Sequence, residues 1–256
     1  MEMKGLMGGF YRISEWIMRL SVTNVLWIIC SIPVFFLLLA AMTSPEDVFM
    51  QTLVLIAIVS PFTLFPATAA MFAVARKWVM GEGDVPLLKT FFRGYKENYL
   101  QSMIGGILYV IIGVILIVNY RFYVSQAGTL QLLSVLFITF GVILMASLFN
   151  FFSILVHLHM KTLQIVKNAL LITIGNPLAS VALIVINGLI LYISVTQFTF
   201  LIPFFMGSLV SAFSFFMFYK SFSRLQQKQQ ELEEKEQEKL AVQTDQTEEE
   251  ADEVKK

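Results

Sequence analysis

The sequence predicts an all-α fold, a polytopic transmembrane helix bundle with short amphipathic helices at the inner membrane interface. Of its 256 residues, 57% are hydrophobic and only 14% are charged, whereas about a quarter are charged in soluble domains. Apolar runs about 20 residues long recur along the chain, and Lys and Arg gather in alternate loops. Together with the single Cys30, this composition excludes a soluble globular enzyme, a disordered chain and a secreted disulfide scaffold.

Residues 1–20 are predicted to form an N-terminal interfacial helix. Arg12, Glu15 and Arg19 are expected to face away from its apolar stripe. That stripe consists of Phe10, Ile13, Trp16, Ile17 and Leu20. Residues 21–222 are predicted to form the membrane domain that follows.

Six spans are expected in the membrane domain, none with an Asp, Glu, Lys or Arg in its interior. They lie at about residues 21–42, 51–75, 102–118, 130–156, 177–195 and 198–219. The first is expected to be retained in the protein, because Leu39-Ala40-Ala41-Met42 lacks the A-x-A pattern of a signal-peptide cleavage site.

Several residues are candidate kink or packing positions within the spans. Pro61 and Pro66 remove backbone N–H groups, which leaves the carbonyls of Ala57 and Phe62 without their helical partners. The break could line a substrate site, but a packing kink is the favoured interpretation because membrane helices tolerate proline. The full set is Asn24, Pro33, Pro61, Pro66, Asn176 and Pro177. The asparagines Asn24, Asn150 and Asn187 are expected to form hydrogen bonds between helices.

The distribution of positive charge predicts the orientation in the membrane. Six spans leave seven segments outside the membrane, and the three on one side carry only Arg121 between them. The inner segments carry Lys4, Arg12, Arg19, Arg76, Lys77, Lys89, Arg93, Lys96, Lys161, Lys167, Lys220, Arg224 and Lys228. Because Lys and Arg stay on the cytoplasmic side of short loops, both termini are expected in the cytoplasm of a plasma-membrane protein.

A second amphipathic segment is predicted between residues 82 and 100, with Asp84 as its N-cap. Leu88, Phe91, Phe92, Tyr95 and Tyr99 fall on one face, and the cations fall on the other. The helix could lie at the lipid headgroups, which we favour, or pack beneath the spans. The candidate contacts to a partner or to lipid are Lys89, Arg93, Lys96 and Tyr95. Residues 161–174 form a third inner segment that ends at Gly175-Asn176-Pro177.

Residues 223–256 are predicted to form a charged cytoplasmic tail with 6 basic and 11 acidic residues. Its Gln, Glu and Lys residues favour a helix from Arg224 to Leu240, followed by disorder from about Gln243. Leu225 and Leu232 alone are too few positions for a coiled coil.

Four phrases of the sequence resemble the YesL-like family of bacterial integral membrane proteins, over about residues 5–222. They are Phe10-Tyr11-Arg12-Ile13-Ser14-Glu15-Trp16 leading to Asn24-Val25-Leu26-Trp27 and Ile32-Pro33; Phe65-Pro66-Ala67-Thr68-Ala69-Ala70; Phe91-Phe92-Arg93-Gly94-Tyr95-Lys96-Glu97-Asn98; and Gly175-Asn176-Pro177-Leu178. The resemblance implies a multi-span plasma-membrane protein of uncharacterised function. It also implies genes encoded beside those for carbohydrate uptake and polysaccharide degradation, and it supplies no catalytic residues.

No catalytic, cofactor-binding or metal-binding residues are expected. The sequence has no phosphate-binding Walker loop, no G-x-S-x-G elbow and no H-E-x-x-H motif. His157 and His159 are two residues apart, so they do not share a helix face on which one metal could bind. The sequence therefore predicts a non-enzymatic accessory protein that contacts the lipid bilayer and another membrane complex, with no nucleic-acid partner and no oligomeric state indicated. The resemblance implies that this complex is one such as a sugar-uptake permease. A transporter or channel for a small solute such as an oligosaccharide is the alternative.

Overall fold

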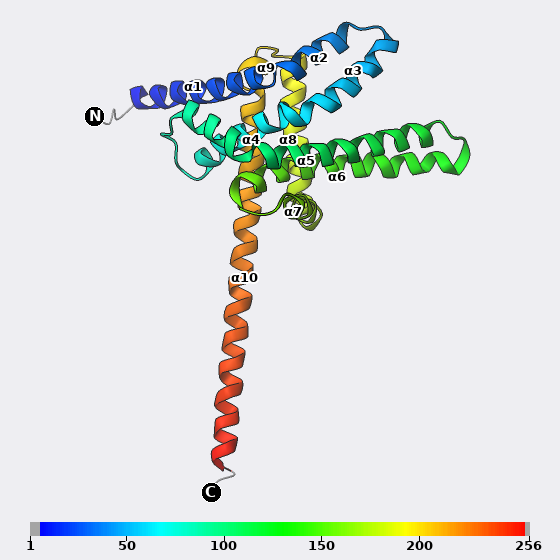
Figure 1. The fold of residues 1–256 in the computed structure, drawn as a ribbon. Helices are drawn as coiled ribbons and strands as arrows, with labels where there is room; N and C mark the ends of the chain where they lie inside the picture. Colours follow the sequence, from blue (N-terminus) through cyan, green and yellow to red (C-terminus); the bar gives the residue numbers. More distant parts are fainter. Residues whose placement is uncertain (1–5, 254–256) are drawn as a thin grey trace. The chain divides into compact units, whose positions relative to one another are not determined.

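The all-α prediction is confirmed by a computed structural model (Figure 1), which describes the backbone of residues 6–253 and the side chains of residues 9–45, 48–235 and 237. Ten α-helices and two 3-10 helices make up the described backbone. The chain divides into two compact units, Met1–Met217 and Phe218–Lys256. The first unit contains the apolar helices and the candidate site.

The N-terminal segment and the start of the first predicted span form one helix, α1 (Leu6–Cys30). We expected a boundary near residue 20, but no proline lies between Leu6 and Cys30 to stop the helix. The break comes instead at Ser31, and α2 (Ile32–Thr43) begins there with Pro33 in its first turn. The interfacial placement of residues 1–20 stays a prediction, and residues 1–5 lie outside the described residues.

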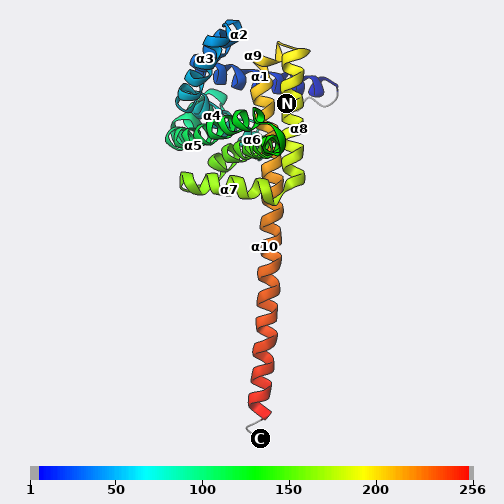
Figure 2. The ribbon, with the colours of Figure 1, turned by 90° about the vertical axis from the view of Figure 1, so that its right-hand side faces the viewer.

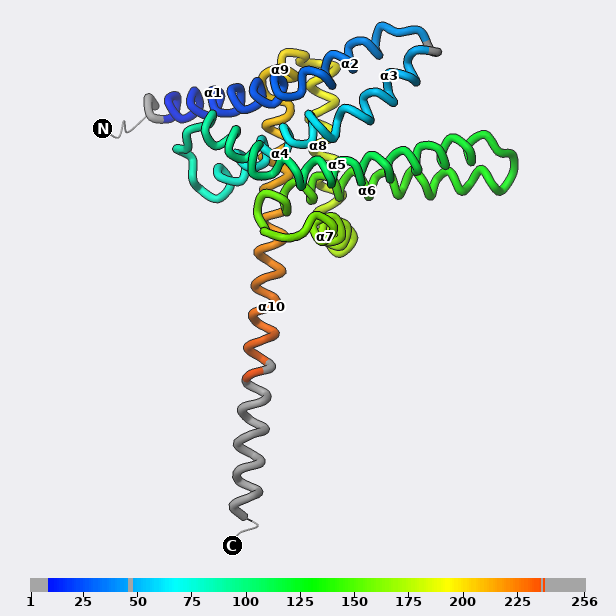
Figure 3. The backbone as a smooth tube through the Cα atoms, in the orientation of Figure 1, coloured from blue at the N-terminus to red at the C-terminus, as the bar shows by residue number. Residues whose placement is uncertain are grey.

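The second predicted span is a broken helix. It consists of α3 (Glu46–Val59), the 3-10 turn η1 (Ser60–Phe62) and α4 (Leu64–Val79). The two α-helical parts are bent by 47°. The path out along α2 and back along α3 into α4 can be followed in Figure 3.

The second amphipathic segment is not a separate helix, because it continues into the third span as α5 (Leu87–Val124). No proline lies between Leu87 and Val124, so nothing interrupts the hydrogen-bond ladder where we expected a boundary. Its 38 residues extend about 57 Å at 1.5 Å per residue, well beyond the roughly 30 Å of a hydrocarbon core. Helix α5 is therefore long enough both to cross a bilayer and to extend beyond it.

Helix α5 and helix α6 (Leu133–His157) form an antiparallel hairpin, joined through the 3-10 turn η2 (Gly128–Leu132) (Figure 1). Helix α7 (Thr162–Gly175) follows, and it ends before Asn176 and Pro177. Pro177 then occupies the first position of α8 (Pro177–Thr196), where a missing N–H costs nothing.

Two further helices follow α8. They are α9 (Leu201–Phe204) and α10 (Met206–Glu253). Within the first unit, α8 and the beginning of α10 run across the α5–α6 hairpin. Figure 2 views that hairpin nearly along its length, while α8 still runs up the view. The two helix pairs therefore cannot both stand along the normal of one bilayer.

Four helical stretches are long and apolar enough to cross a membrane: Gly9–Cys30, Leu87–Val124, Gly128–His157 and Pro177–Thr196. The broken pair of α3–η1 and α4 makes a fifth if it counts as one span. The predicted sixth span, residues 198–219, is not among these stretches. Its apolar helix is short, because the helix restarts at Met206 and Lys220 soon follows. The protein is thus a multi-pass membrane protein with four or five candidate spans.

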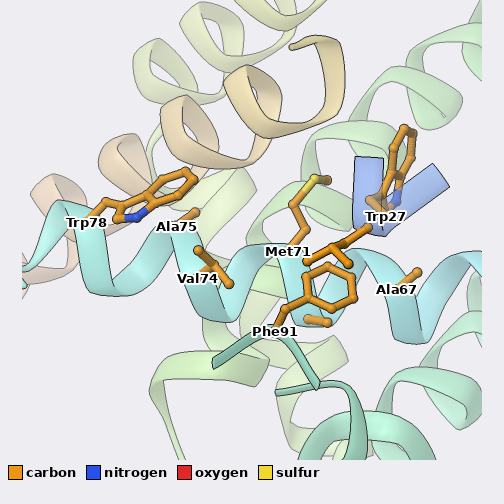
Figure 4. Close-up of a cluster of buried hydrophobic side chains, with 9 residues drawn as sticks. Trp27, Ala67, Met71, Val74, Ala75, Trp78 and Phe91 are labelled. Carbon is orange, nitrogen blue, oxygen red and sulfur yellow. The ribbon is translucent and has the colours of Figure 1, made fainter. Parts of the chain in front are cut away.

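Helix α4 forms the centre of the hydrophobic core. Trp27 of α1 and Phe91 of α5 approach it from two sides, as Figure 4 shows. Four of its alanines have no exposed surface: Ala67, Ala69, Ala70 and Ala75. Small side chains let neighbouring helix backbones approach closely, which is how membrane helices associate without a hydrophobic driving force between them.

The second unit is the continuation of α10 from Phe218. Near its start the rings of Phe218 and Phe222 stack with centroids 5.6 Å apart, and Leu225 and Leu232 are exposed. The backbone is helical to Glu253, past Gln243, where we expected disorder to begin. Gln, Glu, Lys and Leu favour the helical state and no Gly or Pro interrupts them, so the local sequence offers no stop signal.

Candidate functional site

The main candidate site is an open cavity of about 1100 Å³ in the first unit, lined by α4, α5 and the junction between α6 and α7. We call it the cationic cavity. Five cationic side chains line it: Arg76, Lys77, Lys89, Arg93 and Lys161. Arg76 and Lys77 at the end of α4 and Lys89 and Arg93 at the start of α5 stand on either side of one short loop, whereas Lys161 lies far along the chain. All of them belong to segments predicted to be cytoplasmic.

The last turns of α4 supply Arg76 and Lys77. Arg76 is half-buried, and its Nη1 donates a hydrogen bond to the carbonyl of Val156 in α6, 2.9 Å away. That carbonyl lies in the last turn of α6, where backbone acceptors lack helical partners. Arg76 therefore joins the two helix ends and is fixed in place at the cavity wall.

The first turns of α5 supply Lys89 and Arg93, which lie four residues apart and so share a helix face. Gly94 is buried beside them, and a Cβ at this position would come 2.7 Å from Cβ of Ala73 in α4. The missing side chain lets α5 pack closely on α4. This close packing brings the cations of α5 near Arg76.

The α6–α7 junction forms the third wall. Gln101 of α5 holds it through a hydrogen bond from Nε2 to the Met160 carbonyl, 2.8 Å long. The backbone N–H of Lys161 donates to Oε1 of Gln164 over 3.4 Å, at the start of α7. His159 and Lys161 are exposed and line the cavity from this side.

Positive charge in the cationic cavity is only partly neutralised. Glu97 is the one acidic residue among its lining side chains, and it pairs with Arg93 at 2.8 Å. Lys77 pairs with Glu82, 2.6 Å away. Among the residues that the structure describes, Arg76, Lys89 and Lys161 have no carboxylate partner. The cavity thus presents three uncompensated cations to any ligand.

The predicted contact residues divide into two groups. Lys89 and Arg93 line the cationic cavity, whereas Lys96 is exposed outside it. Tyr95 is half-buried against the core around α4, and its ring centroid lies 5.7 Å from that of Tyr99. Phe91 is fully buried, so this face of the amphipathic segment packs beneath α4 and only Leu88 and Phe92 remain exposed.

Proline residues lie at the break between α3 and α4, and polar side chains occupy the freed acceptors. Ser60 Oγ donates to the Ala57 carbonyl at 3.3 Å. The Tyr99 hydroxyl, 3.2 Å away, donates to the Phe62 carbonyl, the acceptor that Pro66 leaves open. Sequence reasoning placed Tyr99 on the apolar face of its helix but did not predict this contact, because it spans 37 residues of chain. The protein's own side chains therefore satisfy both carbonyls at the bend.

Asn24 connects α1 to the break between α9 and α10. Its side chain is fully buried, and Nδ2 donates to the Ile202 carbonyl at 2.9 Å. Its Oδ1 accepts from the backbone N–H of Gly207 (2.8 Å) and of Ser208 (3.2 Å), at the start of α10. These N–H groups lack helical partners, so Asn24 supplies an N-cap from another helix, and the expected hydrogen bond between helices is confirmed.

The other asparagines also act between helices. Asn150 donates to Thr173 Oγ1 at 2.9 Å and Asn187 donates to Ser214 Oγ at 2.8 Å. Pro33 lies at the α1–α2 break, Asn176 lies between α7 and α8, and Pro177 begins α8.

One basic residue outside the cavity differs from our expectation. Arg19 was expected to face away from the apolar stripe, but it is buried and donates to Glu15 and, at 2.5 Å, to Asp84. Asp84 is therefore a partner of Arg19 rather than the N-cap of α5, a position that Pro86 occupies. Arg19 also stacks 5.6 Å from the Trp16 ring. No local pattern predicts this contact between α1 and the α4–α5 loop.

The described side chains contain no group of three or more His, Cys, Asp or Glu residues placed to hold a metal ion. The chemistry that the cationic cavity offers is instead the binding of anions, through Arg and Lys donors and several side-chain amides.

Comparison with known proteins agrees with the sequence resemblance. Residues 20–120 match a family described as a protein of unknown function, DUF624. The chain is 32% identical to the uncharacterized protein YteU of Bacillus subtilis (strain 168), over 82% of this chain and 84% of the relative. It is 30% identical to the uncharacterized protein YesL of the same organism, over 79% and 84%. It is also 30% identical to the uncharacterized protein YesV, over 55% of this chain and 67% of that relative. No solved structure matches. The chain is an integral membrane protein that belongs to the DUF624 family, together with its YesL-like relatives.

Proposed function

We propose that this protein is a non-enzymatic accessory component of the plasma membrane that binds an acidic cytoplasmic surface of a carbohydrate-uptake permease. The observation that carries the proposal is the concentration of cations at one end of α4, α5 and α7, three of them without carboxylate partners among the described residues. Complementary charge steers protein encounters and suppresses wrong partners. The choice of a carbohydrate permease rests on the YesL-like resemblance and its implied gene neighbourhood.

We also propose six crossings with both termini in the cytoplasm, on the strength of the charge asymmetry between the loops. Because α8 and the beginning of α10 run across the α5–α6 hairpin (Figure 1), six crossings require the two pairs to lean in opposite directions. Tilts of up to about 40° occur in membrane helices. A reporter active only outside the cell, fused after Thr199, should be active if six crossings exist. An inactive reporter there would favour four crossings, with the termini still inside.

A photo-crosslinking amino acid at Lys96 tests the proposed partner directly. This side chain is exposed on α5 and lies outside the cavity wall, so the replacement leaves the core intact. In native membranes we expect a crosslink to a permease subunit, identified by mass spectrometry, and a weaker crosslink from the same position in a Lys89→Glu, Arg93→Glu variant. The same group at Tyr120, near the other end of α5, is the matched control. Equal amounts of the crosslinked subunit from Lys96 and Tyr120, or no crosslinked subunit from Lys96, would contradict the proposal.

A transporter or channel remains the second candidate, and the 47° break between α3 and α4 is the observation that favours it. Broken helices line binding sites in many transporters. The bonds that Ser60 and Tyr99 make to the freed carbonyls favour a structural kink instead. Uptake of labelled oligosaccharide into proteoliposomes that contain the purified protein would decide for transport.

A further inference from the structure

We infer that the cationic cavity binds a phosphate-bearing anion, either a soluble phosphorylated compound or the headgroup of an anionic phospholipid. This goes beyond the proposed function, which concerns a protein partner, and it does not require that partner. The two sources share one chemistry, a phosphate group held by fixed cations with hydroxyl groups beside it.

Arg76 provides the fixed donor group. The bond from Nη1 to the Val156 carbonyl holds the guanidinium at the wall, and its charge has no carboxylate partner among the described residues. Planar guanidinium groups bind phosphate oxygens through paired hydrogen bonds, and a preplaced group loses little side-chain entropy on binding. Lys89 and Lys161, on the other walls, add two mobile point charges.

Neutral polar groups in the same cavity are suited to the rest of such a ligand. Asn98 donates to the Gly94 carbonyl and Gln101 to the Met160 carbonyl. Their side-chain oxygens have no hydrogen-bond partner within the described part of the chain. Oxygens of this kind accept hydrogen bonds from ligand hydroxyls. The volume of about 1100 Å³ is that of a small-molecule site rather than a site for a lone phosphate.

The general enrichment of Lys and Arg in cytoplasmic segments could by itself explain cations at this end of the membrane domain. That rule requires no convergence of cations on a cavity. Lys167 of α7 follows it without lining the cavity, and it is exposed on the helix surface. Arg76 and Lys89 stand on either side of the α4–α5 loop and Lys161 lies far along the chain, and the three nevertheless line the same cavity.

The test uses the full chain in phosphatidylcholine nanodiscs. Calorimetric titration with glucose 6-phosphate and with inorganic phosphate probes the soluble source, and glucose is the uncharged control. In the lipid arm, phosphatidylglycerol replaces part of the phosphatidylcholine, and the rise in unfolding temperature is measured.

The decisive variant is Lys89→Gln with Lys161→Gln, because both side chains are exposed and their loss leaves the core unchanged. For whichever ligand binds, the soluble phosphate or phosphatidylglycerol, we expect the double variant to bind about tenfold more weakly. This is the size of effect that a lost charged contact produces. Arg76→Gln should weaken binding at least as much, and Arg76→Lys should restore part of it. Lys96→Gln, also on α5 but outside the cavity, should have no effect. Binding should also weaken as salt is raised.

The inference is overturned if neither glucose 6-phosphate nor inorganic phosphate binds saturably and phosphatidylglycerol gives no rise in unfolding temperature. It is equally overturned if the double variant binds as well as the unmodified protein. Since the purified protein is tested alone, a missing permease crosslink would leave this result unaffected, so the two proposals can fail separately.

Discussion

The two ends of the α5–α6 hairpin differ in what surrounds them. Near the cationic cavity, α5 is packed against protein: Gly105, Gly106 and Tyr109 are buried, and the Tyr109 hydroxyl lies 2.7 Å from Ser147 Oγ. Toward the other end, large apolar side chains are exposed, among them Ile111, Val114, Ile115, Ile117 and Val118. Lipid is as apolar as these side chains, so their exposure carries no penalty in a bilayer. The middle of α5 thus packs in a protein core, and the part that follows is suited to contact with lipid.

The largest effect should come from adding one methyl group to the packed part of α5, and the same addition in its exposed part is the control. A Cβ at Gly105 would collide with the Phe151 ring, whereas nothing lies within 4 Å of one at Gly113. We expect Gly105→Ala to lower the free energy of unfolding by about 2 kcal/mol. Gly113→Ala should be neutral or slightly stabilising, because alanine favours helix. Unfolding in detergent measures both, and equal effects would contradict the distinction between the two ends.

A somewhat smaller loss is expected from removing asparagine amides. Asn24→Ala deletes the bonds to Ile202, Gly207 and Ser208 and should cost about 1–2 kcal/mol, since single polar contacts between membrane helices contribute roughly 0.6 kcal/mol on average. Among the described residues, Asn119 in the apolar half of α5 bonds only to the carbonyl of Ile115 in its own helix. Asn119→Ala is therefore the control, and its unfolding curve should overlay that of the unmodified protein.

Removing one hydroxyl group should have a still smaller effect. Tyr109→Phe breaks the contact with Ser147 but keeps the ring against Phe151, so we expect a loss of about 1 kcal/mol. Tyr120→Phe is the matched change near the opposite end and should leave stability unchanged. A larger loss at Tyr120 than at Tyr109 would reverse the comparison.

The smallest effect is expected at the ion pair on the cavity rim. Arg93 and Glu97 have side chains 73% and 56% exposed, and exposed pairs of this kind contribute little because solvent screens them. Glu97→Gln should leave the unfolding temperature unchanged while strengthening anion binding, since it removes the one carboxylate on the cavity wall. Titration of the variant with glucose 6-phosphate measures the second effect.

Local patterns predicted most of the helices, because the length of an apolar run and the position of a proline depend only on residues that are close in sequence. The breaks at Pro33, Pro61 and Pro177 follow from local chemistry of this kind. The continuity of α5 through residue 101 could have been anticipated, since no helix-breaking residue lies there. The change from amphipathic to apolar composition marks a change of surroundings for this helix and not its end.

The cationic cavity could not be predicted from local patterns. Lys89 and Arg93 were recognised as one face of a helix, but Arg76 and Lys161 join them only through the packing of α4, α5 and the α6–α7 junction. The contacts of Gly94 with α4 and of Gln101 with Met160 bring these walls together. Such contacts depend on which helices are neighbours, which hydrophobic periodicity does not specify. The burial of Arg19 was missed for the same reason.

The central claim is that the cationic end of the hairpin faces the cytoplasm while its other end is outside the cell. Single cysteines at Lys161 and at Thr129, in a chain whose Cys30 is replaced by alanine, test it with a membrane-impermeant maleimide. We expect Thr129→Cys to be labelled in intact cells and Lys161→Cys to be labelled only after permeabilisation. Labelling of Lys161→Cys in intact cells would contradict the orientation and, with it, the proposed function.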